Sequence, residues 1–158
     1  MSLRIHLRPV ADADSPFLYD LYKESRAAEF APLNLLEAQL EALMTSQYRV
    51  REQSYRSQFP DAEHSIVFAD DTCVGQLRVY RTEKEHRLVD IALARQHRGQ
   101  GIGTRVVENL IAAAKSARVP LTSTVAVNNH GSLRFHQRLG FTVIGEDPMD
   151  LQLEYPAS

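Results

Sequence analysis

The chain has 158 residues, of which 44% are apolar and 24% charged, and its formal net charge is −2 at pH 7. This length suits a single domain over residues 1–158, and the near-neutral charge gives no support for nucleic acid or an anionic membrane as a partner. The single cysteine, Cys73, excludes an intramolecular disulfide, and no His/Cys spacing is typical of a metal site. No apolar run is long enough to cross a membrane, so we expect a cytoplasmic protein.

The first part of the chain predicts one strand and two helices. Residues 3–7 alternate apolar and polar side chains like a strand, and Pro16 follows capping residues typical of a helix start. This first helix is expected to end near Ala28, so that Glu29 lies in a loop. A long polar helix then follows over residues 35–58.

Three strands of an antiparallel meander come next. Residues 65–69 and 73–80 predict a hairpin, and Gly75 inside it indicates a bulge or a close backbone approach. The third strand, residues 88–93, is nearly all apolar, so we expect it to be buried on both faces.

A glycine-rich loop separates that strand from an amphipathic helix over residues 103–117. The segment from Arg98 to Gly103 holds three glycines, which let the backbone turn sharply. The helix amides and the helix dipole then favour an anion, and Arg98 adds a positive charge. By itself this segment could also be a plain strand-to-helix turn without a ligand.

The last part of the chain predicts a strand over residues 121–127, parallel to the strand over 88–93 because a helix connects them. Asn129 is a good N-cap for the helix that follows, and Gly140 is a good C-cap. Two closing strands complete the chain, over residues 141–144 and 151–155.

Two motifs in this order resemble the GNAT N-acetyltransferase family. Arg98, Gly101 and Gly103, directly after an apolar strand, are similar to its Arg-x-x-Gly-x-Gly acetyl-CoA signature. The segment from Asn129 to Phe141 is similar to its N-x-x-A-x-x-[LF]-Y-x-x-x-G-F pattern. This resemblance covers essentially the whole chain and implies an α/β (α+β) GNAT fold, with a central mixed, mostly antiparallel six- to seven-stranded sheet, a splayed parallel strand pair and flanking helices.

The resemblance implies acetyl-CoA as acyl donor and no metal. Amides of the loop would hold the pyrophosphate, and pantetheine would lie where the parallel strands splay apart. An N–H near Leu93 would polarise the thioester oxygen, and Phe135 would line the thiol end, unless it is plain core. The expected cofactor-binding residues are Ile91, Ala92, Leu93, Arg98, Gly99, Gln100, Gly101, Ile102, Gly103, Thr104, Asn129, Ser132 and Phe135.

His136 stands where the family pattern has a tyrosine, which is thought to protonate the departing CoA thiolate. His136 could donate that proton as imidazolium or through a neutral N–H. At its unperturbed pKa of about 6.5 it would be partly charged at neutral pH. Alternatively, His136 packs on the helix face and water donates the proton.

Two carboxylates are candidates for the base that takes a proton from the substrate ammonium. Asp90 lies inside an otherwise apolar strand, where a carboxylate needs a partner, so it could equally be structural. Glu29 lies in the expected loop after the first helix, which borders the acceptor site in the family. The sequence does not choose between them.

The implied function is direct transfer of an acetyl group to a primary amine of a small molecule or peptide, without a covalent acyl-enzyme. Two alternatives stay open: a catalytically silent acyl-CoA sensor, and an acyltransferase that uses another acyl-CoA. No motif identifies the acceptor. Tyr48, Arg51, Tyr55 and Arg56 on the long helix could line a substrate groove or form a solvated face. A homodimer is possible.

Overall fold

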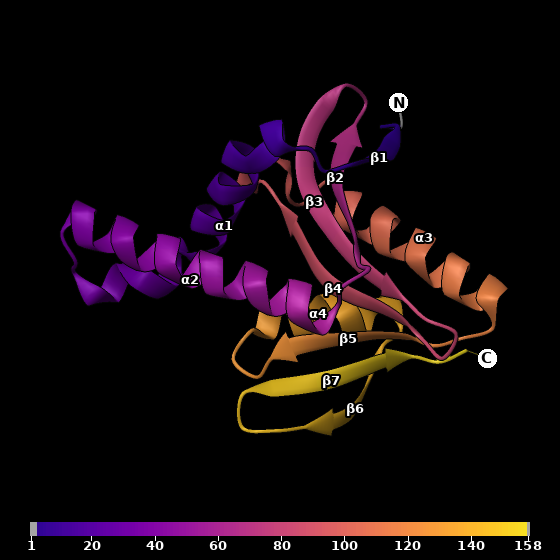
Figure 1. The fold of residues 1–158 in the computed structure, drawn as a ribbon. Coiled ribbons are helices and arrows are strands. Elements are labelled where there is room, and N and C mark those ends of the chain that lie inside the picture. The colour runs from indigo at the N-terminus through magenta and orange to yellow at the C-terminus, as the bar shows by residue number, and fades with distance from the viewer. Residues whose placement is uncertain (1–2, 158) are drawn as a thin grey trace. The chain divides into compact units, whose positions relative to one another are not determined.

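The computed structural model describes residues 3–157, whose contacts form two compact units. The N-terminal unit holds residues 3–77 and 92–98, and the C-terminal unit holds residues 78–91 and 99–157. The elements, of which the α-helices and strands are labelled in Figure 1, are β1 (Ile5–Pro9), η1 (Asp12–Asp14), α1 (Ser15–Phe30), η2 (Ala31–Leu33), α2 (Glu37–Gln58), β2 (Glu63–Ala69), β3 (Thr72–Arg81), β4 (His86–Leu93), η3 (Arg95–His97), α3 (Ile102–Ala117), β5 (Leu121–Ala126), α4 (His130–Leu139), β6 (Thr142–Glu146) and β7 (Asp150–Tyr155).

The strands form one seven-stranded mixed sheet in the order β1-β2-β3-β4-β5-β7-β6, as expected. β4 and β5 pair in parallel, and β1 with β2, β5 with β7 and β6 with β7 pair antiparallel. Among the described residues, the parallel pairing covers only His86–Leu88 against Leu121–Ser123. β5 continues to Ala126 with β7 as its partner, so β4 and β5 are paired only where they begin.

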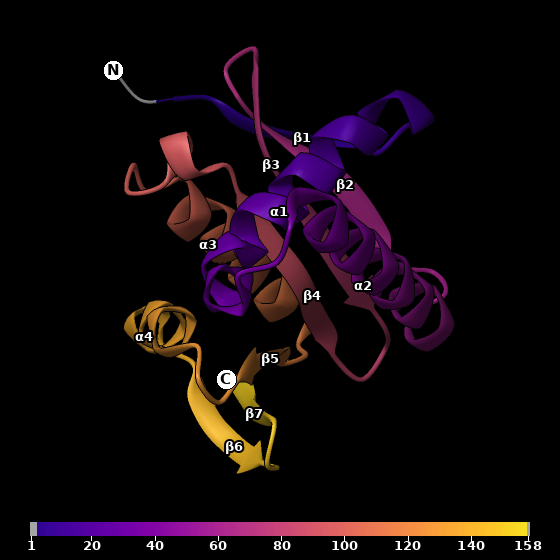
Figure 2. The ribbon, with the colours of Figure 1, turned by 90° about the vertical axis from the view of Figure 1, so that its left-hand side faces the viewer.

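In the N-terminal unit, α1 and α2 lie side by side (Figure 2). The first helix has proline in its first turn, where a missing N–H costs nothing. Tyr22, Phe30 and Met44 form the buried cluster between the two helices. The hydrophobic effect at this seam therefore fixes the helix pair.

Gly75 on β3 lies against the end of β4, within the same unit. A Cβ atom at this position would lie 2.2 Å from the carbonyl oxygen of Ala92 and 2.7 Å from a methyl group of Leu93. The expected close backbone approach is confirmed, because only glycine leaves room for this contact.

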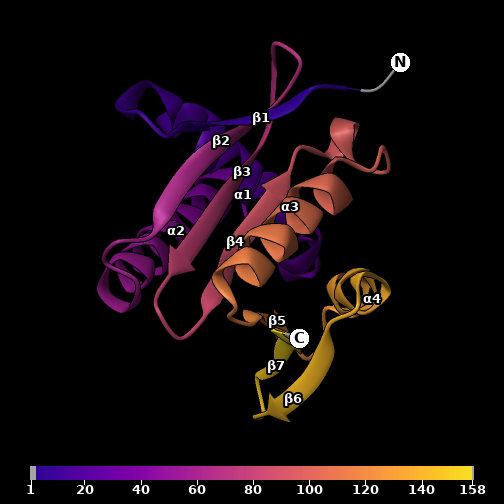
Figure 3. The same ribbon diagram turned by 90° about the vertical axis from the view of Figure 1, so that its right-hand side faces the viewer.

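In the C-terminal unit, α3 contacts β5, and β7 lies between β5 and β6 (Figure 3). The apolar stripe of α3 is buried as its helical spacing predicts, with Leu121, Val125 and Leu153 among the buried strand residues. The buried stripe comprises Ile102, Val106, Val107, Leu110, Ile111 and Ala114.

Two expectations are corrected by the structure. Glu29 lies within α1, because that helix continues to Phe30 and turns only at η2 and the left-handed Asn34. β4 is not buried on both faces: only His86 and Leu88 are buried, and residues 89–93 are half-buried, beyond the pairing with β5.

Within residues 3–157, no helix is both long and apolar enough to span a bilayer.

Candidate active site

The loop before α3 turns through two left-handed glycines. Gly99 has φ +77° and Gly101 has φ +80°, values that side-chain-bearing residues rarely adopt. Gly101 occupies the N-cap of α3 and provides no side-chain cap, and the first turn of that helix carries no acidic residue. The loop is exposed, whereas Ile102 is 1% exposed and anchors the helix start. The first amides of α3 are therefore suited to bind an anion.

The end of β4 and the η3 turn, in the N-terminal unit, orient Arg98. Ile91, Ala92 and Leu93 are half-buried. The Nε–H of Arg98 donates to the carbonyl oxygen of Leu93 at 3.1 Å. The Ala94 amide donates to the carbonyl oxygen of Val74 on β3 at 2.8 Å, which fixes the start of the turn. The Leu93 carbonyl is thus already used to position the guanidinium that precedes the glycine loop.

Glu24 of α1 contacts the same turn from another part of the chain. Its Oε1 atom accepts a hydrogen bond from the Arg95 amide and lies 3.9 Å from Nη2 of Arg98. The N-cap of η3 is Ala94, which has no side-chain cap of its own. A carboxylate from α1 therefore performs the task that a local capping side chain usually performs.

The start of α4, in the C-terminal unit, is closed by Asn129 as expected. Its Oδ1 atom accepts from the Ser132 amide at 3.1 Å. At the other end, Gly140 adopts φ +107° and ends the helix. Ser132 and Phe135 are half-buried on this helix, while Asn129 is exposed.

His136 is buried on the inner face of α4, with 3% of its surface exposed. Its Nδ1 atom lies 2.8 Å from the carbonyl oxygen of Ser132, and its Nε2 atom lies 3.0 Å from Oγ of Ser123 on β5. A carbonyl only accepts, so Nδ1 carries the proton and the Ser123 hydroxyl donates to Nε2. Phe135 and Phe141 pack edge-on against the ring.

This environment keeps the imidazole neutral. Burial lowers the pKa of His136 below 6.5, and the hydrogen bond with the Ser132 carbonyl opposes the shift without reversing it. The expected partial charge at neutral pH is therefore corrected. The proton-donor role of His136 stays a prediction, and its one N–H already has an acceptor.

The two candidate bases lie in different surroundings. Glu29 forms a two-point ion pair with Arg26, at 2.5 Å from Oε2 to Nε and 3.0 Å from Oε1 to Nη2, and its side chain is 62% exposed. Asp90 is half-buried midway along β4. Their roles stay predictions.

The model of the acetyltransferase (GNAT) family matches residues 18–141, which include the loop, α3 and α4. The chain belongs to this family. The family predicted from the two motifs is thereby confirmed.

Similar proteins fit this GNAT membership. A 5-NmdU N-acetyltransferase of Pseudomonas phage PaMx11 is 38% identical over 56 residues, which are 35% of this chain and 39% of the phage protein. The match thus spans less than half of that relative's length.

Solved GNAT structures share the fold. The PaiA N-acetyltransferase of Thermoplasma acidophilum, in complex with coenzyme A, is 21% identical with a TM-score of 0.71, over 97% of this chain and 99% of that one. PseH of Campylobacter jejuni, with acetyl coenzyme A, is 18% identical with a TM-score of 0.62, over 98% and 100%. An Arabidopsis thaliana protein bound to the bisubstrate analogue CoA-Ac-MVNAL is 15% identical with a TM-score of 0.63, over 96% and 97%.

The aromatic residues of α1 and α2 pack together. Tyr48 lies 5.2 Å from Tyr19 and 5.0 Å from Tyr22 between ring centroids. Arg51 lies over the rings of Tyr22 and Tyr55, at 4.9 and 5.4 Å. Of the residues expected to line a groove or a solvated face, Tyr48 therefore contributes to the helix seam, and Arg56 is exposed.

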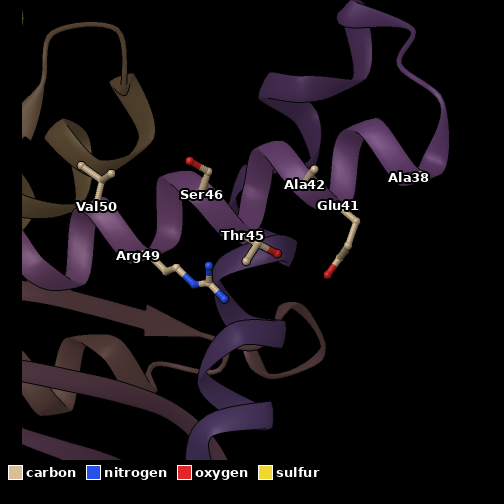
Figure 4. Close-up of a pocket in the computed structure, with 7 residues that line it drawn as sticks. All are labelled: Ala38, Glu41, Ala42, Thr45, Ser46, Arg49 and Val50. Carbon is tan, nitrogen blue, oxygen red and sulfur yellow. The ribbon is translucent and has the colours of Figure 1, made fainter.

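A depression lies along α2 (Figure 4), where the Tyr19 hydroxyl of α1 lies 3.0 Å from Oε1 of Glu41 and 2.8 Å from Oγ1 of Thr45. Glu41, Thr45 and Arg49 line one side of it, and small or apolar side chains line the other. Every lining residue belongs to α2: Ala38, Glu41, Ala42, Thr45, Ser46, Arg49 and Val50.

The sequence did not identify Glu24 or Ser123. Glu24 contacts Arg95 across 71 positions, and no local pattern signals such a contact. Ser123 lies between two threonines in β5, so nothing in the sequence distinguished it as the partner of a buried histidine. In the part of the chain described, no group of three His, Cys, Asp or Glu side chains is placed to hold a metal ion.

Proposed function

We propose that this GNAT chain transfers an acetyl group from acetyl-CoA to a primary amine of a small molecule or peptide. The observation that carries the proposal is the start of α3, where left-handed glycines precede a helix whose first turn has no side-chain cap. In a member of this family, such a helix start suits the pyrophosphate of the donor. The similar structures bound to coenzyme A or acetyl coenzyme A support the same donor.

Different groups of this chain would bind different parts of the acyl donor. Amides from Gly99 to Thr104 and the guanidinium of Arg98 would bind the pyrophosphate, aided by the dipole of α3. Backbone groups of Ile91 and Leu93 would pair with pantetheine amides, as an added strand does. An N–H near Leu93 would polarise the thioester oxygen.

The transfer itself needs one nucleophile and no acyl-enzyme. The neutral amine attacks the thioester carbonyl carbon, so that a C–N bond forms and the C–S bond breaks. The extra proton of the amine passes to a base, and CoA leaves as a thiolate. Because that thiolate has a pKa near 8.5, water can protonate it, and the hydrogen bonds of His136 favour water over the imidazole as donor.

Release of CoA tests this function. The purified protein is mixed with acetyl-CoA and a panel of polyamines, amino acids, peptides and 5-NmdU, and free thiol is followed with a thiol reagent. We expect one class of amine to stimulate release. If no amine does so while acetyl-CoA raises the melting temperature, the silent acyl-CoA sensor replaces the enzyme, and bulkier acyl-CoA donors test the third alternative.

The base is assigned by two matched variants. We propose Asp90 as the base, because it is half-buried on β4, the strand proposed to bind pantetheine, whereas the Glu29 side chain is 62% exposed. Asp90→Asn should lower kcat/KM by about 100-fold, the usual size of general base catalysis, and Glu29→Gln by less than about threefold. The opposite ranking in steady-state kinetics would assign the base to Glu29.

We also propose a cytoplasmic homodimer that pairs α2 with the α2 of a second copy, antiparallel. Glu41 and Arg49 are exposed and lie four residues on either side of the half-buried Thr45 (Figure 4), and Oε1 of Glu41 also accepts a hydrogen bond from the Tyr19 hydroxyl of α1 at 3.0 Å. In such a pair each Glu41 faces the Arg49 of the other copy, and small side chains let the axes approach within about 8–10 Å.

A charge swap tests this dimer. Glu41→Arg and Arg49→Glu should each give a monomer by light scattering, and the double variant should restore the dimer. Glu108→Arg, an exposed change on α3, is the matched control. A monomeric wild type, or a double variant that stays monomeric, contradicts the pairing.

A further inference from the structure

Two ends of a short turn are held by one carboxylate of a distant helix. The turn comprises η3 and Arg98, directly before the glycine loop, and the carboxylate is Glu24 of α1. All of these residues belong to the N-terminal unit.

The first contact fixes the backbone of the turn. The Arg95 amide donates to Oε1 of Glu24, and the turn closes through His97 N–H to Ala94 O at 2.9 Å and Arg98 N–H to Arg95 O at 3.2 Å. Because the Ala94 side chain cannot cap the turn, the Glu24 carboxylate accepts the hydrogen bond of the first amide of the turn, that of Arg95.

The second contact concerns the guanidinium. Nη2 of Arg98 lies 3.9 Å from Glu24, and Nε donates to the carbonyl oxygen of Leu93. A guanidinium has five N–H donors in a rigid plane, so fixing one edge orients the donors of the other. The side chain of Arg98 is 48% exposed, which leaves it accessible to a ligand.

We propose that Glu24 is a positioning residue for donor binding: it holds the η3 turn and the Arg98 guanidinium ready for the pyrophosphate of the acyl donor. This inference rests on the proposed function, since it assumes that Arg98 binds that pyrophosphate. Glu24 touches neither donor nor acceptor. Its contribution is to avoid the entropy lost when a mobile turn and a long side chain become ordered on binding.

The hydrogen bond to Arg95 carries more of this effect than the ion pair. The Arg98 contact is long, and both side chains are partly exposed, so the ion pair contributes little. Glu24→Gln keeps an oxygen that accepts from the Arg95 amide and should change the KM for acetyl-CoA by less than about twofold. Glu24→Ala loses both contacts and should raise that KM about tenfold, the effect of one charge-assisted hydrogen bond, with kcat within twofold.

The donor itself provides the decisive control. S-acetyl-pantetheine has the thioester but no pyrophosphate, so its kcat/KM should be the same for Glu24→Ala and the wild type. A general structural defect would lower the rate with both donors and would overturn the inference. Asp20→Ala is the matched control on α1, because the Asp20 side chain is 73% exposed and pairs with Lys23 of the same helix, at 3.6 Å.

A double-mutant cycle tests whether Glu24 acts through Arg98 and its turn. In an Arg98→Ala background, Glu24→Ala should raise the KM for acetyl-CoA by less than about twofold, because the two changes remove one shared effect. Full additivity would overturn the inference. Calorimetric titration with CoA gives the same comparison without any acceptor, so a wild type that binds CoA but turns over no amine contradicts the proposed activity and leaves the test of Glu24 intact. A wild type that binds no CoA overturns both.

Discussion

The two helices α3 and α4 both belong to the C-terminal unit but begin in opposite ways. α3 starts at the left-handed Gly101 and has no side-chain cap, while α4 starts at Asn129, whose side chain accepts from the Ser132 amide. An unsatisfied helix start is a place for an anion, and a satisfied one is not. A helix start without a side-chain cap can therefore be as informative about function as a capped one.

The largest effect, on the KM for acetyl-CoA, should come from placing a charged side chain at the start of α3. Gly101→Asp places a carboxylate where the amides of α3 would bind the pyrophosphate, and asparagine and aspartate tolerate the left-handed conformation better than other residues. We expect the KM for acetyl-CoA to rise by about 100-fold, through competition for the amides and repulsion of the phosphates. Steady-state kinetics and calorimetric titration with CoA measure the change.

Gly101→Asn separates charge from shape. It has the same size and similar backbone preference, so its effect on KM should be about tenfold smaller, because the repulsion is gone. Equal effects of the two variants would mean that α3 binds no anion.

A smaller effect concerns the inner face of α4, where His136 is buried and neutral. Its folded pKa lies below the unfolded value of about 6.5, so the unfolded chain binds the proton first as the pH falls. The stability associated with a neutral His136 is complete above that pH and is lost as the pH falls from about 6.5 toward the lower folded pKa. The slope is at most about 1.4 kcal/mol per pH unit for this one proton.

His136→Gln removes this proton while keeping an amide that can donate and accept. Urea denaturation between pH 8 and pH 5 should show a shallower loss of the free energy of unfolding in the variant than in the wild type. Parallel curves for the two proteins would show that His136 is protonated equally in the folded and unfolded states.

The smallest effect, on the free energy of unfolding, should come from removing the side-chain cap of α4. Asn129→Ala removes the cap and should lower the free energy of unfolding by about 1 kcal/mol, or about 2–4 °C in melting temperature. Asn129→Asp keeps an accepting oxygen and should stay near the wild type in calorimetry. A rise in the KM for acetyl-CoA in both variants would instead place the Asn129 amide against the donor, as the family resemblance implies.

Features that depend on neighbouring residues could be predicted from the sequence. The caps of α4, Asn129 and Gly140, follow from their own backbone chemistry, and the buried stripe of α3 follows from its helical spacing. Gly75 was predicted to allow a close approach because glycine inside a strand has few other uses. The connecting helix predicted the parallel strand pair, and the family resemblance implied the whole sheet.

Features that depend on distant contacts could not be predicted. Glu29 was placed in a loop because Pro32 follows closely, but the contact of Phe30 with the α1–α2 cluster holds the helix to that point. Glu24 belongs to the same class, since its partners Arg95 and Arg98 follow some seventy positions later.

The contact between Gly75 and the Ala92 carbonyl has a consequence for how variation at this position should look. In a library of all single substitutions, position 75 should reject every side chain, while its apolar neighbour Val74 should accept other aliphatic ones. Across homologues this backbone contact would then leave no covariation, because one of its partners never changes. The constraint at the end of β4 would be invisible to any method that infers contacts from paired changes.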